Sequence, residues 1–342
     1  MKLTDSEFSL LNDWQRDFPL VERPYAVLAE SLGTNDASVL RSLGRLIERG
    51  HISRIGAVFR PHVLGASTLA AVACPPERIE AVARTIDAYP EVNHNYEREH
   101  RYNLWFVVAA PTRTDVTAVL ADIQRGTGLA PLDLPMQADF HIDLGFDLAA
   151  RAAPDARSKA RVHHPDGAGR DADAAQLRSL LRPADYCLAA ALEAGLPLTP
   201  YPFAQRAARC GLDEAVCIAR IAELQACSIV RRFGVVVRHR ELGYTANAMV
   251  VWNVPDARIE TVGRRLAAQP AVTLCYQRPR RLPDWPYNLF SMVHGQDRAA
   301  VLAEIDAMRA RLGIDDLPYR PLFSRRRFKQ CGARYSSLAR AA

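Results

Sequence analysis

Histidine, tyrosine and arginine alternate along one short segment of this chain, a pattern that predicts acid–base chemistry on an anionic ligand. Residues 93–107 read NHNYEREHRYNLWFV. In an extended strand, side chains two residues apart lie on the same face, so His94, Tyr96 and Arg98 can converge on one ligand. An imidazole exchanges protons near neutral pH, and a guanidinium binds a carboxylate through two parallel hydrogen bonds.

The pattern occurs a second time without its histidines. Residues 273–293 read TLCYQRPRRLPDWPYNLFSMV, in which His94 aligns with Leu274, and His100 aligns with a stretch that carries two prolines and Trp285. Five residues recur in the same order: Tyr96, Arg98, Tyr102, Asn103 and Leu104 correspond to Tyr276, Arg278, Tyr287, Asn288 and Leu289. A duplicated polar cluster with asymmetric histidines suggests a pseudo-symmetric site with an acid–base group on one side.

The repeat covers most of the chain. Residues 54–65 (RIGAVFRPHVLG) match residues 232–243 (RFGVVVRHRELG), and Leu134-Pro135 is aligned with Leu317-Pro318. Residues 149–176 between the copies are rich in Ala, Arg, Asp, Gly and Pro and lack apolar periodicity, which predicts a flexible linker.

Each copy follows the same order of elements. Helical apolar spacing predicts three short helices and then a strand at 52–59, which together form a helix-turn-helix with a wing. A β-α-β-β-α-β pattern follows, with a central hairpin at 92–98 and 102–109 and a closing strand at 135–144. We therefore predict an α+β protein with two tandem copies of a winged helix-turn-helix plus a ferredoxin-like domain, forming an internal pseudo-dimer. The predicted boundaries are helix-turn-helix domains at 1–54 and 177–232, ferredoxin-like domains at 55–148 and 233–335, and the linker at 149–176.

Composition restricts the class of protein. Hydrophobic residues make up 49% of the 342 residues, which indicates a globular chain. No apolar run is long enough to span a bilayer, the first residues do not resemble a signal peptide, and the seven cysteines are scattered. We expect a cytoplasmic protein without a disulfide framework, zinc site or membrane contact. Of the 44 basic residues all but three are arginine, which reflects either codon bias or a polyanionic ligand.

The hairpin segments NHNYEREHRYNLWF and LCYQRPRRLPDWPYNLF, together with RRFGVVVRHRELGY, resemble the sirohaem decarboxylases, whose fold is that of the Lrp/AsnC regulators. The first half resembles the D-type subunit and the second half the L-type subunit. The resemblance implies removal of two acetate carboxyl groups of sirohaem as carbon dioxide, giving 12,18-didecarboxysirohaem in haem d1 biosynthesis. It implies no cofactor beyond the iron of the substrate. The expected partners are iron tetrapyrroles, further copies of the chain or related decarboxylase subunits.

Such a substrate requires cations, because a buried polyanion without compensation is very unfavourable. Arg54, Arg98, Arg232 and Arg278 stand at repeated positions and are the first candidates. Arg60, Arg238, Arg280 and Arg281 come second. The other predicted substrate contacts are Tyr102, Tyr276, Tyr287, Asn103, Asn288 and Trp285, whereas Trp105 and Phe290 are equally consistent with a place in the core.

Loss of carbon dioxide from a ring acetate leaves carbanion character that must be protonated, which favours histidine as the acid. His94 is the first candidate, followed by His100 and by His239 from the other half, and Tyr96 is grouped with them as catalytic. His94 or His239 can instead act as an axial ligand of the substrate iron. The sequence does not decide between these roles, nor between one active site and two.

Two other functions are compatible with this fold. A DNA-binding regulator would use residues 35–49, which carry Arg41, Arg45 and Arg49. Residues 212–225 of the second copy carry Asp213, Glu214 and Glu223 with only one arginine, which argues against DNA binding. A haem-binding protein without catalysis would explain the asymmetric histidines less well.

Overall fold

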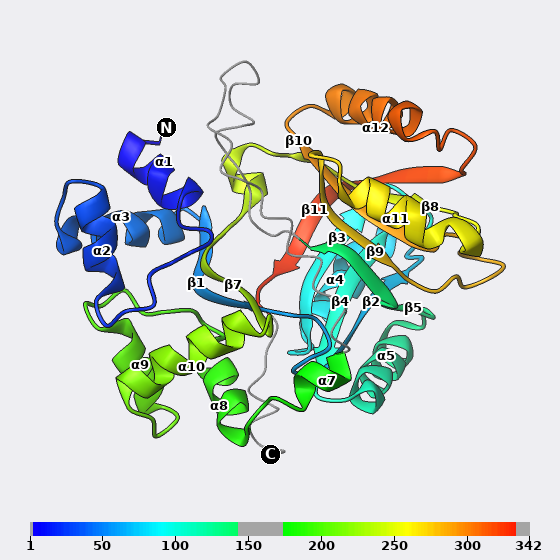
Figure 1. The fold of residues 1–342 in the computed structure, drawn as a ribbon. Helices are drawn as coiled ribbons and strands as arrows, with labels where there is room; N and C mark the ends of the chain where they lie inside the picture. The colour runs from blue at the N-terminus through cyan, green and yellow to red at the C-terminus, as the bar shows by residue number, and fades with distance from the viewer. Residues whose placement is uncertain (1–2, 143–173, 333–342) are drawn as a thin grey trace. The chain divides into compact units, whose positions relative to one another are not determined.

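A computed structural model describes residues 3–142 and 174–332 (Figure 1). The chain forms two compact units, each built from both halves of the sequence. Of the described residues, the first contains 3–65 and 174–238, and the second contains 66–142 and 239–332. The α+β fold with two helix-turn-helix copies and two ferredoxin-like copies is confirmed. Most of the predicted linker lies outside the described residues.

The helix-turn-helix unit repeats one set of elements. The first copy contains α1 (Asp5–Asn12), α2 (Pro24–Ser31), α3 (Asp36–Glu48) and β1 (Ile52–Phe59). The second contains α7 (Ala174–Arg178), α8 (Pro183–Leu192), α9 (Pro202–Ala208), α10 (Glu214–Ala226) and β7 (Val230–Val237). Side-chain caps define where several helices begin: Thr4 and Glu7 form a capping box at α1, and Asn35 accepts a hydrogen bond from the Ser38 backbone at α3.

The two wings pair with each other. β1 and β7 form an antiparallel ladder with Gly56 opposite Gly234. Gly234 must be glycine because a Cβ there would lie 2.4 Å from the Gln15 carbonyl oxygen. The predicted boundaries at residues 54/55 and 232/233 fall inside these two strands, and the compact unit that contains the strands extends to Gly65 and Arg238.

The second unit is built on one nine-stranded sheet. Its strand order is β5-β2-β4-β3-β11-β8-β10-β9-β6. The first half supplies β2 (Ala66–Val72), η1 (Pro76–Arg78), α4 (Ile79–Asp87), β3 (Val92–Arg98), β4 (Leu104–Ala110), α5 (Arg113–Thr127), β5 (Leu132–Pro135) and β6 (Ala138–Ile142). The second half supplies η2 (His239–Leu242), β8 (Ala246–Trp252), η3 (Asp256–Arg258), α11 (Ile259–Ala267), β9 (Val272–Gln277), β10 (Leu289–Gly295), α12 (Arg298–Leu312) and β11 (Tyr319–Gln330).

The halves of this unit exchange their closing strands. The predicted strand at 135–144 divides into β5, which pairs with β2, and β6, which pairs with β9 of the other half. β11 of the second half is one continuous strand that also pairs with both halves. Its first part pairs with β8 of its own half, and its last part pairs with β3 of the first half. Leu134 lies opposite Leu69 and Leu322 opposite the equivalent Met249, so Leu134 corresponds to Leu322. The alignment of Leu134-Pro135 with Leu317-Pro318 is wrong for this reason.

The sheet has helices on one side and a shared core on the other. α4 and α5 cover the first half, and α11 and α12 cover the second (Figure 1). The opposite side of the strands, the inner face, carries a cluster drawn from both halves that includes Trp105, Met249, Trp285 and Phe290. Burying each of these large side chains contributes about 1.5–3 kcal/mol, so the shared cluster stabilises the pairing of the halves. In the described part of the chain, no helix has the length and apolar character of a membrane span.

Candidate functional site

The predicted grouping of His94, Tyr96 and Arg98 on one face of β3 is supported by the strand register. Tyr96 lies opposite Trp105 and His94 opposite Val107, and both partners pack on the inner face. The rings of His94 and Tyr96 stack with their centroids 6.3 Å apart. The Arg98 guanidinium lies 5.7 Å from the centroid of the Tyr96 ring. The three side chains thus form one contiguous group.

Arg98 and Arg278 occupy equivalent positions, of which that of Arg98 is buried and that of Arg278 is half-buried. Arg98 donates a hydrogen bond of 3.0 Å to the Leu322 carbonyl, and Arg278 donates one to the equivalent Leu134 carbonyl. Burial lowers the pKa of both guanidinium groups below the usual value. Tyr96 and Tyr276 oppose this lowering of the pKa at Arg98, so a tyrosine from each half lies near it.

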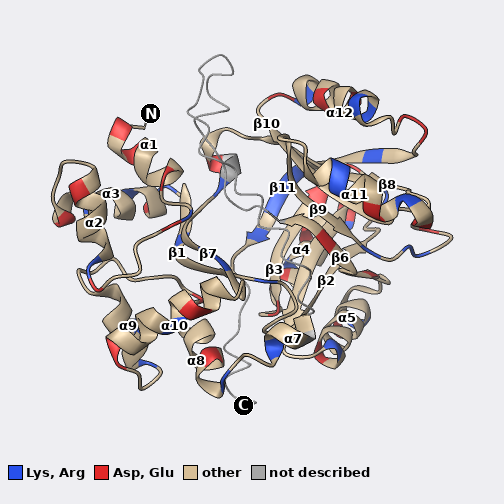
Figure 2. Ribbon diagram, in the orientation of Figure 1, with Lys and Arg blue, Asp and Glu red and all other residues tan. Residues whose placement is uncertain are grey.

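Neither guanidinium has a carboxylate ion pair among the described residues, although Asp133 raises the pKa of Arg278, and the buried Nε of each lacks a hydrogen-bond partner there. A buried cation without a counter-charge is costly unless an anion joins it. The arrangement therefore suits a carboxylate ligand, and it differs from the basic strand β11 (Figure 2), where Arg326 and Arg327 already pair with Glu97 and Glu241.

His100 lies in the loop that joins β3 to β4. Its Nδ1 accepts a hydrogen bond of 3.0 Å from the backbone N–H of Tyr102, and its ring meets the edge of Trp285 at a centroid distance of 5.3 Å. Burial lowers the pKa of His100, and Arg320 and Arg101 lower it further. The imidazole is therefore neutral at pH 7, which suits a base or an iron ligand better than an acid.

His100 and Arg98 also line a hollow of about 520 Å³. The remaining lining residues are Pro76, Ile79, Glu97, Glu99, Asn103, Arg325 and Arg326. In the second half Arg280 follows Arg278 by two residues, as His100 follows Arg98, and it donates to the side chains of Asn253 and Asp256 and to the carbonyls of Val254 and Pro286. The two halves therefore differ in the chemistry offered at equivalent places.

The predicted aromatic contacts lie mainly in the core. Trp285 is fully buried and contacts Tyr102, Trp105 and Tyr287 at centroid distances of 6.1, 5.1 and 5.0 Å. Trp105 and Phe290 are also core residues. Trp285 thus packs the loop of the second hairpin against the first hairpin. Its contact with a substrate stays a prediction.

The side chains of Asn103 and Asn288 form hydrogen bonds with backbone groups of neighbouring segments. Asn103 accepts a hydrogen bond from the Cys74 N–H and donates to the Cys74 carbonyl, and Asn288 makes the same pair of bonds with Val254. Both amides are therefore used in fixing the turn after the preceding strand. The second N–H of the Asn103 amide is not used in these bonds, and substrate contact by either asparagine stays a prediction.

The remaining candidates belong to the other compact unit or have side chains outside the described part of the structure. Arg54 and Arg232 belong to the helix-turn-helix unit, where they donate to the carbonyls of Ala57 and Val235 on their own strands. His239 begins η2, and its side chain lies outside the described part of the structure. Among the described residues no cluster of three or more His, Cys, Asp or Glu side chains fits a metal ion.

Sequence reasoning missed two asparagines that hold histidines on the inner face. Asn93 Oδ1 lies 2.6 Å from His94 Nδ1, and Asn247 Oδ1 lies 2.6 Å from His294 Nδ1. Asn93 precedes His94 directly, so the alternation of a regular strand would place the two side chains on opposite faces. Only the register of the strands shows otherwise.

Comparison with known proteins identifies the family. The siroheme decarboxylase NirDL-like HTH domain family matches residues 7–52 and 188–231, and the AsnC-like ligand binding domain family matches residues 64–141 and 241–329. The siroheme decarboxylase NirDL subunit of Paracoccus denitrificans (strain Pd 1222) is 43% identical over 99% of this chain and 100% of that protein. The siroheme decarboxylase of Hydrogenobacter thermophilus (strain DSM 6534 / IAM 12695 / TK-6) is 32% identical over 94% and 92%.

A solved structure agrees with these relatives. The crystal structure of the siroheme decarboxylase NirDL in co-complex with an iron-uroporphyrin III analogue is 26% identical, covers 98% of this chain and 96% of its own, and has a TM-score of 0.65. The curated relatives are carboxy-lyases, and their similarity runs through both units and both halves. The chain belongs to the siroheme decarboxylase family, as a fused NirDL-type member.

Proposed function

We propose that this chain removes two acetate carboxyl groups from sirohaem as carbon dioxide, giving 12,18-didecarboxysirohaem for haem d1 biosynthesis. The observation that carries the proposal is the 43% identity to a siroheme decarboxylase NirDL subunit over essentially the full length of both chains. The arginines of the inner face support it, since they match the acidic character of the substrate.

The reaction sets two requirements for the protein. Each acetate side chain, R–CH2–COO⁻, takes up one proton and becomes R–CH3 with release of carbon dioxide, so no oxidant or reductant is consumed. One group must neutralise and orient the carboxylates, and another must deliver a proton to the carbon that the carboxyl group leaves.

Arg98 and Arg278 are the proposed carboxylate-binding residues. Arg98 is buried and Arg278 half-buried, and each is held on one side by a backbone carbonyl of another strand. A guanidinium positioned in this way loses little rotamer entropy when it binds an anion. Its other N–H groups can donate hydrogen bonds to a carboxylate. Tyr96 and Tyr276 lie under the two guanidinium groups and fix their planes.

His94 is the proposed proton donor, with Tyr96 as its neighbour. It lies on the same face as Arg98, whereas its counterpart Leu274 has no acid–base function. His100 is neutral at pH 7 and is proposed as a base. The iron belongs to the substrate, and His94 or His239 remains the proposed axial ligand.

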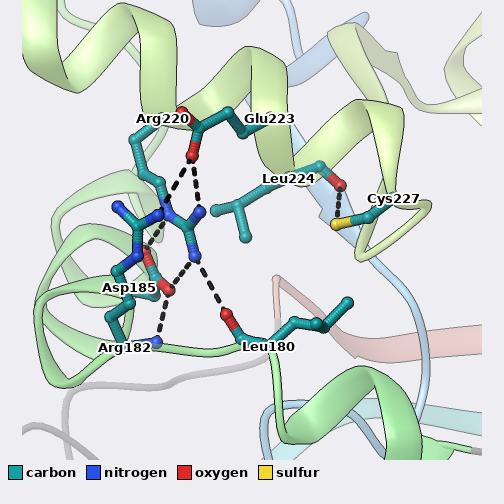
Figure 3. A network of polar contacts seen from close by, with 7 residues as sticks. All are labelled: Leu180, Arg182, Asp185, Arg220, Glu223, Leu224 and Cys227. Atoms are coloured by element: carbon teal, nitrogen blue, oxygen red, sulfur yellow. Dashed lines mark hydrogen bonds and ion pairs between the residues drawn. The ribbon is translucent and has the colours of Figure 1, made fainter.

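The helix-turn-helix unit is proposed to serve assembly rather than DNA recognition. Its wings are used in pairing with each other. Arg45 of α3 and Arg49, which directly follows this helix, each lie 3.6 Å from the buried carboxylate of Glu7. In the second copy Arg220 of α10 is bound by Asp185 at 2.7 Å (Figure 3). These ion pairs leave few cations for phosphate contacts.

Anaerobic incubation with sirohaem, followed by mass spectrometry of the product, tests the proposal. The wild-type chain is expected to yield a product that has lost two carbon dioxide molecules. His94→Gln should still bind substrate, seen as a shift of its absorption spectrum, but turn over at least about 100-fold more slowly. His51→Gln, in the other unit, controls for loss of an imidazole. Unchanged mass of sirohaem with the wild-type chain would refute the proposed activity.

A further inference from the structure

A β-bulge at Asn93 brings two neighbouring side chains of β3 together. Val92 lies opposite Val108 and His94 opposite Val107, so Asn93 is an extra residue in its strand. Such a bulge leaves one residue outside the regular pairing and redirects its side chain. It explains how Asn93 contacts the residue that follows it.

The contact defines the protonation pattern of His94. Asn93 is 5% exposed, and its Oδ1 lies 2.6 Å from His94 Nδ1. With its amide oxygen turned to the ring, Asn93 accepts a hydrogen bond, an arrangement that favours the neutral imidazole with its proton on Nδ1. Nε2 is then the nitrogen that gains and loses a proton. Stacking on Tyr96 limits rotation of the same ring.

The second half contains the same bulge without this contact. Leu274 lies opposite Met292 and Val272 opposite Val293, which makes Thr273 the extra residue at the position of Asn93. Thr273 is nearly buried as well, and its hydroxyl donates to the Met292 carbonyl at 3.4 Å. The bulge itself therefore does not require asparagine. Asparagine stands where a histidine follows, and threonine stands where a leucine follows.

We propose that Asn93 is a positioning residue for proton transfer, which holds His94 as the Nδ1–H tautomer and directs its Nε2 to the substrate. This inference rests on the proposed function, because it assumes that His94 delivers the proton. Asn93 acts through His94 and does not itself touch the reacting atoms.

Other ionisable groups lie near His94 and must be considered in any pH dependence. Its own strand contributes Tyr96 and Arg98, and β4 contributes none between Leu104 and Ala110. β11, which places Gln330 opposite His94, contributes Arg327 opposite Tyr96 and Lys329 opposite Asn95. Cys331 follows this strand and donates its backbone N–H to the Asn93 carbonyl. Arg327 is paired with Glu241, and Asp87 of α4 lies on the opposite side of the sheet with Asn95.

Nitrogen NMR of the full chain, labelled at its nine histidines, tests the inference without substrate. The His94 signals, assigned by their loss in His94→Gln, should show a protonated Nδ1 and an unprotonated Nε2 at high pH. Asn93→Asp keeps the acceptor and adds a negative charge, so the pKa of His94 should rise by about one unit or more. The alkaline limb of the kcat–pH profile should move upward by the same amount. Asn93→Ala should give a mixture of tautomers and a kcat about tenfold lower, the equivalent of one hydrogen bond.

Thr273→Asn places the same amide on the second bulge and serves as the matched control. It should change neither the His94 signals nor the pH profile. An unprotonated Nδ1 in the wild-type chain, or an unchanged His94 pKa in Asn93→Asp, would overturn the inference. If the tautomer is as expected but His94→Gln retains full turnover, His94 is not the proton donor. Asn93 would still be shown to fix the tautomer of His94.

Discussion

Replacing Arg98 by methionine should make the ligand-free protein more stable while it weakens substrate binding. The substitution removes a hydrogen bond to the Leu322 carbonyl and a contact over the Tyr96 ring. These losses amount to about 1 kcal/mol for the hydrogen bond and about 0.5–1 kcal/mol for the ring contact. Methionine fills a similar volume without a charge.

Removing the buried charge should raise the free energy of unfolding by more than the loss of these two contacts lowers it. Burial lowers the pKa of Arg98, which means that the folded state disfavours its charged form at every pH below that value. The desolvation penalty of one buried ion is several kcal/mol, and no described carboxylate forms an ion pair with this one. We expect the free energy of unfolding to rise by about 1–2 kcal/mol, or Tm by about 2–8 °C.

Arg220→Met is the matched control for stability. Its guanidinium pairs with Asp185, whose side chain is 1% exposed, so removing the cation leaves a buried carboxylate (Figure 3). This variant should lose about 3–5 kcal/mol of stability and retain substrate affinity. Thermal unfolding without ligand and spectroscopic titration with iron-uroporphyrin III measure the two effects. The reasoning is refuted if Arg98→Met is destabilised like Arg220→Met, or if it binds the acidic porphyrin as tightly as the wild-type chain does.

Three further predictions follow from described contacts. Trp285→Ala should lower the free energy of unfolding by about 3–5 kcal/mol, because a fully buried ring that joins the two hairpins is lost; a denaturant titration showing less than about 1 kcal/mol would contradict this. The pKa of Glu7 is lowered by the backbone N–H of Thr4 and by two arginines, so its stabilisation is present above pH 4.5 and is lost as pH falls through the lower folded value. Glu7→Gln should therefore be less stable than the wild-type chain at pH 7 and equally stable at strongly acidic pH. The intact chain should bind duplex DNA only weakly and without sequence preference, with affinity falling steeply with salt in fluorescence anisotropy; tight binding of one sequence would instead support a regulator.

Local sequence patterns were sufficient for the elements but not for their partners. The strands at 52–59 and 92–98 were predicted with the bounds that the structure has, because alternation and turn residues are local signals. The exchange of β6 and β11 between halves was not predicted. The alternation along residues 135–144 shows which side chains share a face but not which strand lies beside them.

The site was predictable to the same extent. The period of two placed His94, Tyr96 and Arg98 together correctly. It could not reveal the contact of Asn93, because a bulge adds one residue without a sequence signal of its own. Trp285 is predicted to contact the substrate because an aromatic ring can pack on a flat macrocycle, whereas its full burial depends on packing against the other hairpin, which the sequence does not show.

The recurrence of a residue in both halves has two different causes here, and the structure separates them. Asn103 and Asn288 recur because each amide satisfies both backbone groups of an equivalent residue, and that need follows from the fold alone. Arg98 and Arg278 recur although their charges are costly to bury, so the fold alone gives no reason to keep them. A duplicated residue that satisfies its surroundings indicates structure. A duplicated residue that the surroundings leave unsatisfied indicates a ligand, and this criterion selects the two arginines as the pair most worth testing with an acidic tetrapyrrole.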